Sequence, residues 1–120
     1  MPNTQAVTEA DTSYPAMRNR RAWVRYPCDL DSSCQALMAA RGLQWTAKVR
    51  NVSQGGIAVT MQRRFELGTL LAFEVQGPPG KSSVSLLGRV AHVTAKSDGS
   101  WLIGCAFSTP LTEADLKALL

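Results

Sequence analysis

Residues 43–61 read LQWTAKVRNVSQGGIAVTM, and this stretch decides the fold. One face of its first half carries Leu43, Trp45, Ala47, Val49 and Asn51. Polar residues alternate with these positions, which is typical of an antiparallel strand with one solvent-exposed face. Two glycines then indicate a tight turn, and residues 57–61 favour another strand. The stretch therefore predicts two neighbouring strands.

Further strand segments lie on both sides of this stretch, and the chain takes on β character from Asp29 onward. Together with 43–52 and 57–61, we predict strands at 33–40, 69–75, 83–95 and 101–107. Six short strands separated by turn signals predict an all-β fold, either a small antiparallel barrel or a sandwich.

The last segment, residues 111–120, changes to a helical period. Thr112 can cap this helix, and Asp115 stands at the capping-box position. An apolar stripe is predicted at Leu111, Leu116, Leu119 and Leu120.

The composition is that of an ordinary soluble domain. The 120 residues are 45% hydrophobic and 18% charged, and a net charge of +4 leans only weakly toward anionic partners. We expect no membrane segment and no secretory signal, because no apolar run is long enough and the N-terminus lacks the signal pattern. The cysteines, Cys28, Cys34 and Cys105, do not suggest a disulfide framework, so we expect a cytoplasmic protein.

Arginines gather in residues 18–27, which read RNRRAWVRYP. Arg21 and Arg25 form an R-x-x-x-R pattern, and Arg20 directly precedes it. An arginine fork meets a phosphate, or the O6 and N7 edge of guanine, with two parallel hydrogen bonds, and its plane stacks on a purine. This segment is therefore suited to a guanine dinucleotide with two phosphates.

A second pattern, N-x-S-x-x-G, begins at Asn51, and the 25 residues between Arg25 and Asn51 are about the length of one hairpin. The side-chain oxygens of Asn51 and Ser53 can accept hydrogen bonds from the N–H donors of guanine. Gly55 and Gly56 let the backbone turn sharply and a ring approach closely.

These two motifs, in this order and at this spacing, resemble the PilZ domain family. The resemblance extends from about Arg18 to the end, and residues 88–93 and 101–107 look like the family's last two strands. It implies a six-stranded antiparallel β-barrel with a C-terminal helix that binds cyclic di-GMP. Residues 1–17 are polar with little apolar periodicity and are predicted to form a mobile tail, followed by a PilZ-like domain at 18–120. That domain comprises an arginine ligand loop at 18–27, a barrel at 28–108 and a helix at 111–120.

The resemblance also implies roles for single residues. The predicted ligand-binding residues are Arg20, Arg21, Arg25, Asn51, Ser53, Gly55 and Gly56. Arg20 is compatible with a stacked pair of ligands rather than one. The family often carries tryptophan where this chain has His92, and we expect His92 to be a core or barrel-mouth substitution.

Plainer interpretations stay open. The arginines alone would suit a solvated tail or an RNA-binding patch, and Asn51 and Ser53 alone would suit ordinary turn chemistry. Residues 77–82 lack the first glycine of a phosphate-binding loop and precede a strand, so a hairpin loop is expected. We expect no metal site and no resident cofactor, because paired ligand spacings are missing. We also expect no catalysis, because a single histidine leaves no nucleophile constellation.

The sequence therefore predicts a non-catalytic receptor that binds cyclic di-GMP and signals to a protein partner, with the arginine segment becoming ordered on binding. The alternative is a PilZ-like interaction module that binds no nucleotide. A single-strand nucleic-acid binder is a third hypothesis. We do not expect DNA or RNA as a partner, because the basic cluster is local.

Overall fold

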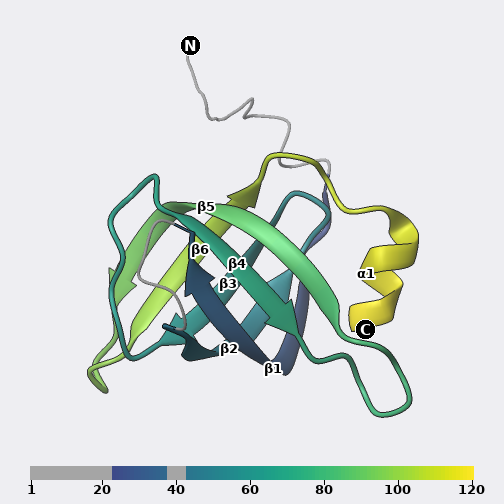
Figure 1. Cartoon of the computed structure of the whole chain (residues 1–120), viewed down its shortest axis with the longest axis horizontal. Helices are drawn as coiled ribbons and strands as arrows, with labels where there is room; N and C mark the ends of the chain where they lie inside the picture. The colour runs from purple at the N-terminus through teal and green to yellow at the C-terminus, as the bar shows by residue number, and fades with distance from the viewer. Residues whose placement is uncertain (1–22, 38–42) are drawn as a thin grey trace.

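The computed structural model describes residues 23–37 and 43–120. Its strands form a closed antiparallel barrel in the order β1-β2-β3-β6-β5-β4, followed by one helix (Figure 1). The elements are β1 Tyr26–Ala36, β2 Trp45–Val52, β3 Gly56–Met61, β4 Leu70–Val75, β5 Val84–Ala95, β6 Trp101–Phe107 and α1 Glu113–Leu119. The predicted all-β fold is confirmed. The sequence left a barrel or a sandwich open, and the structure is the barrel. The predicted tail at 1–17 lies outside the described residues.

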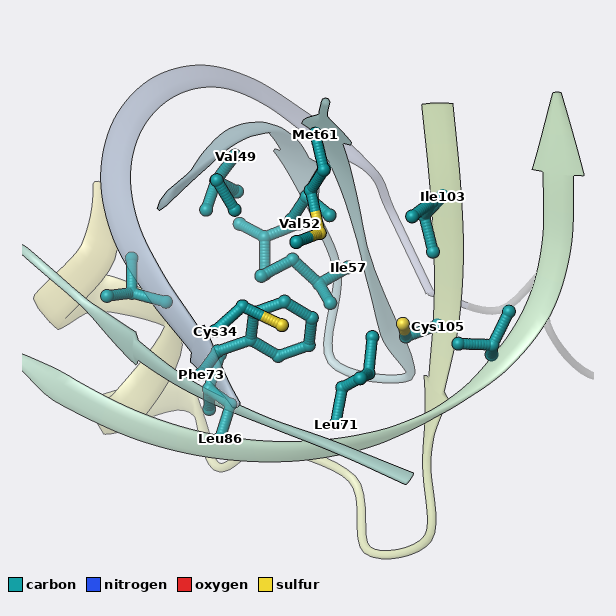
Figure 2. Close-up of a cluster of buried hydrophobic side chains, with 14 of the residues drawn as sticks. Cys34, Val49, Val52, Ile57, Met61, Leu71, Phe73, Leu86, Ile103 and Cys105 are labelled. Carbon is teal, nitrogen blue, oxygen red and sulfur yellow. The ribbon is translucent and has the colours of Figure 1, made fainter. Parts of the chain in front are cut away.

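Apolar side chains fill the interior of the barrel, because residues along each strand point alternately inward and outward. The largest fully buried side chains include Phe73, Ile57, Leu71 and Ile103. Figure 2 shows Phe73, Ile57 and Leu71 converging in this interior. The barrel is therefore a packed core, and the candidate site has to lie on its outside.

Strand β1 begins earlier than the sequence suggested. It starts at Tyr26, and β2 and β4 pair with its two edges, so residues that looked like a loop belong to the sheet. The register of β1 on β2 shifts between Pro27 and Leu30, an irregularity that accommodates the missing N–H of proline. Of the strand predicted at 33–40, residues 38–40 lie outside the described residues.

Strand β2 contains a bulge that the alternation did not predict. Val49 pairs with Val59, but the next partner of β3, Ala58, faces Asn51, so Arg50 is the extra residue. As a result Val52 is fully buried, whereas Asn51 is only partly buried. The prediction that Asn51 shares the face of Val49 is wrong, because a bulge reverses the inside and outside positions beyond it.

The C-terminal helix forms as predicted at its start. The Thr112 hydroxyl accepts a hydrogen bond from the backbone N–H of Asp115 over 3.0 Å. Leu116 and Leu119 are buried in the core, and α1 lies beside β5 at one end of the barrel (Figure 1). Leu120 is 41% exposed, so the predicted stripe is wrong there, because Leu120 is the C-cap and lies past the last helical turn.

Candidate ligand-binding site

A hollow of about 330 Å³ lies on the outer wall of the barrel, where β3, β6 and β5 run side by side. The residues that line it are Trp23, Arg25, Ser53, Gly55, Gly56, Ala91, His92, Gly104, Cys105 and Ala106. Four of the predicted site residues are therefore brought together here. Arg20 and Arg21 lie outside the described residues.

Arg25 and Asn51 join the two sequence motifs. Pro27 pairs with Asn51, and Arg25 lies two residues before Pro27, so the pairing of β1 with β2 brings Arg25 close to Asn51. The Arg25 guanidinium donates a hydrogen bond from Nη1 to Oδ1 of Asn51 over 2.5 Å. The bond holds a cationic fork at the edge of the hollow.

Ser53 organises the turn between β2 and β3. Its hydroxyl oxygen accepts hydrogen bonds from the backbone N–H groups of Gly55 and Gly56 over 3.2 and 3.1 Å, and its side chain is buried. The turn interpretation of Ser53 therefore describes what this residue does within the chain. A contact with guanine stays a prediction.

The same turn is fastened to the C-terminal part of the chain. The N–H of Leu111 donates to the carbonyl of Gln54 over 2.8 Å, and the Gln54 amide donates back to the Leu111 carbonyl over 2.9 Å. The N–H of Phe107 donates to the carbonyl of Gly55 over 3.0 Å. The wall of the hollow is therefore a well-anchored turn.

The two glycines of this turn permit two different close approaches. A Cβ at Gly55 would lie 2.3 Å from Cε3 of Trp23, so the indole ring packs directly on the backbone. A Cβ at Gly56 would lie 2.5 Å from the carbonyl oxygen of Cys105, so this glycine lets β3 and β6 pair. The sequence pattern predicted close approach here, but it did not identify Trp23 as the partner.

His92 lies in this hollow, and the sequence interpretation missed it. The register of β5 on β6 shifts between Val90 and His92, and His92 is exposed beside Gly104 on the outer wall. The expectation of a core or barrel-mouth position is wrong, because the bulge at Ala91 turns the side chain outward. No signal in the sequence of β5 marks that bulge.

The charge of the hollow suits an anion. Arg25 supplies a cation, and no carboxylate is found among the described lining residues. Cys105 borders the hollow, but its side chain is buried in the core, and burial, with a smaller effect of the nearby Cys34, raises the pKa of its thiol to about 12. Nothing in this set of side chains resembles an activated nucleophile.

Other functional elements can be assessed for the described ranges only. Within 23–37 and 43–120, no three histidine, cysteine or carboxylate side chains are grouped to hold a metal ion. In the same part of the chain, no helix is long and apolar enough to cross a membrane.

The fold places the chain among small closed six-stranded antiparallel barrels that carry a C-terminal helix. Residues 19–120 match the PilZ domain, so the chain belongs to the PilZ domain family. No protein with a curated description is matched at a significant level.

Two solved structures are similar in fold. The inhibitor of motility from Bacillus subtilis (MotI/DgrA) is 22% identical with a TM-score of 0.64, over 83% of this chain and 47% of that chain. The PilZ domain of YcgR from Escherichia coli, solved with c-di-GMP, is 11% identical with a TM-score of 0.63, over 83% of this chain and 86% of that one. The chain therefore spans about half the length of the motility inhibitor.

Proposed function

We propose that this PilZ domain is a non-catalytic receptor for cyclic di-GMP that acts in the cytoplasm and needs no resident cofactor. The observation that carries the proposal is the hydrogen bond from Arg25 to Asn51, which places an arginine fork beside a hollow whose described lining has no carboxylate. The choice of ligand is supported by the YcgR relative, whose structure contains c-di-GMP.

The proposed division of labour follows from the chemistry of the ligand. Arg25, with Arg20 and Arg21, binds phosphates and guanine edges through charge-assisted hydrogen bonds. Asn51 positions Arg25, and its amide oxygen has a second lone pair for a guanine N–H. The bare backbone at Gly55 and Gly56 admits the flat face of a base.

The receptor has to convert binding into a signal. Two ligand phosphates neutralise the arginines, and this changes the charge of the surface offered to a protein partner. Arg20 decides whether one ligand or a stacked pair is held. This role of Arg20 rests on the family resemblance.

Calorimetric titration with cyclic di-GMP tests the proposal. We expect saturable binding by the wild type, a loss of at least tenfold in affinity in the Arg21→Ala, Arg25→Ala double variant, and one or two ligands per chain. Arg50→Ala is the matched control, because Arg50 is an exposed arginine next to Asn51 that contacts Asp29 and Thr60 instead.

Two other results would overturn the proposal in different ways. No heat with cyclic di-GMP at high micromolar concentration would favour the nucleotide-independent interaction module. Displacement of the dinucleotide by poly-U at equal phosphate concentration would favour a single-strand nucleic-acid binder, because such binding depends on phosphate number and salt.

A further inference from the structure

A second hollow, of about 670 Å³, lies away from the candidate ligand site. It is formed by the end of β1, the starts of β2 and β4, and the loop that joins β3 to β4, which lies across the barrel from α1 (Figure 1). The described residues of the two hollows do not overlap. We call this face the Arg63 surface, and define it by Leu43, Trp45, Arg63, Arg64, Phe65 and Arg89.

Within the Arg63 surface, the Arg63 side chain is held over two aromatic rings. Trp45 and Phe65 meet edge to face with ring centroids 5.2 Å apart. The guanidinium carbon of Arg63 lies 4.8 Å from the Trp45 ring centroid and 4.7 Å from that of Phe65. These cation–π contacts restrain the side chain before any partner arrives, so binding through Arg63 loses less rotamer entropy.

The charges of the Arg63 surface are predominantly positive. Its hollow is lined by Arg63, Arg64 and Arg89 against one acid, Glu66, which is a formal balance of 3 − 1 = +2. Arg64 and Glu66 approach only to 3.7 Å, and both are exposed, so this pair is weak and an incoming carboxylate competes with it readily. The guanidinium forks match carboxylates in two-bond geometry.

Apolar side chains accompany the arginines. Leu43, in the lining, is 48% exposed, and Leu67, in the adjoining loop, is 67% exposed. Exposed leucines beside fixed arginines provide apolar contact area next to positive charge, a combination common in protein interfaces.

We propose that the Arg63 surface binds an acidic segment of a partner protein that also carries apolar side chains. Charge complementarity selects the acidic character, and the leucines select the apolar residues. A nucleic acid fits less well, because Arg63 lies over both rings and the stacking platforms that single strands need are thereby occupied. This interaction is independent of cyclic di-GMP binding.

Fluorescence anisotropy with the full chain tests this inference. The probe is a short fluorescein-labelled peptide of alternating glutamate and leucine, and the control peptide has lysine in place of glutamate. We expect saturable binding of the acidic peptide only, weakening at least threefold between 50 and 200 mM salt because exposed charges are screened.

Variants then locate the binding. Arg63→Glu, Arg64→Glu should lose at least tenfold in affinity, and the milder Arg63→Lys, which keeps the charge but not the planar fork, should lose an intermediate amount. The charge-matched control Lys96→Glu, Lys117→Glu reverses two exposed lysines elsewhere and should bind as the wild type does.

Equal binding by both reversal variants, failure of the acidic peptide to bind, or preference for oligo-U would overturn the inference. Cyclic di-GMP titration of the same variants checks folding and reports on the proposed function separately.

Discussion

The guanidinium of Arg25 and the amide oxygen of Asn51 are joined by a 2.5 Å hydrogen bond, although the residues are 26 positions apart. The pairing of Pro27 with Asn51 brings them close, because Arg25 lies only two residues before Pro27. The contact fastens the end of the arginine segment to the barrel wall. An anion bound by that segment is thereby held beside Gly55 and Gly56.

Asn51→Leu should weaken cyclic di-GMP binding about tenfold, because a hydrogen bond to a charged group contributes about 1.5–3 kcal/mol. Asn51→Gln should retain most of the binding, since its amide oxygen still accepts from Arg25 and from a guanine N–H without adding charge. Calorimetry on both variants checks this. Equal losses in the two would show that the acceptor oxygen is not what matters.

Gly55→Ala should weaken binding by displacing the Trp23 ring from the backbone, and so moving Arg25, which lies two residues further on. Trp23→Ala should weaken it for the same reason. In the double variant the two losses should not add, because each removes one shared contact. Additive losses in the affinity would mean that ring and glycine act independently.

Gly56→Ala should instead destabilise the fold. Its Cβ would lie 2.5 Å from a backbone oxygen of β6, and a backbone strand cannot move aside as a side chain does. We expect a loss of about 1–3 kcal/mol in the free energy of unfolding. Chemical denaturation measures it, with Gly99→Ala as a turn-glycine comparison whose Cβ has open space but whose φ is +90°. An unchanged unfolding midpoint for Gly56→Ala would contradict the packing described.

The buried thiols should resist alkylation in the native state. Burial raises the pKa of Cys34 and of Cys105 to about 12, so at pH 8 only about one in ten thousand of each is thiolate. As the pH rises toward 12 the reactive fraction grows. Cys28 is less buried and should react first, although burial and Asp29 raise its pKa too. Mass spectrometry after timed iodoacetamide treatment gives the order, and early modification of Cys105 would contradict it.

The barrel was predictable because most of its information is local. Alternating apolar residues, turn glycines and the Thr112 cap each act through neighbours in the chain. The bulges at Arg50 and Ala91 were not predictable, because a bulge is defined by the partner strand that a residue skips. These bulges bury Val52 in place of Asn51 and turn His92 outward.

The candidate site, too, was predictable from the sequence in part only. The 25-residue spacing correctly suggested a hairpin between the motifs, and the structure places Arg25 and Asn51 in contact. The packing of Trp23 on Gly55 depends on how the segment before β1 crosses the β2–β3 turn, which strand patterns do not encode. The pairing of β3 with β6 likewise joins residues far apart in the sequence and builds the wall that holds His92.

The central claim is that cyclic di-GMP binds on the outer wall at the junction of the two motifs. Amide chemical-shift mapping by NMR during a cyclic di-GMP titration tests this most directly, because it reports location as well as binding. We predict that the largest saturable shifts fall on Arg25, Asn51, Gly55, His92 and Gly104, while the Arg63 surface stays unchanged. Shifts concentrated at Arg63, Arg64 and Arg89, or none at saturating ligand, would contradict it.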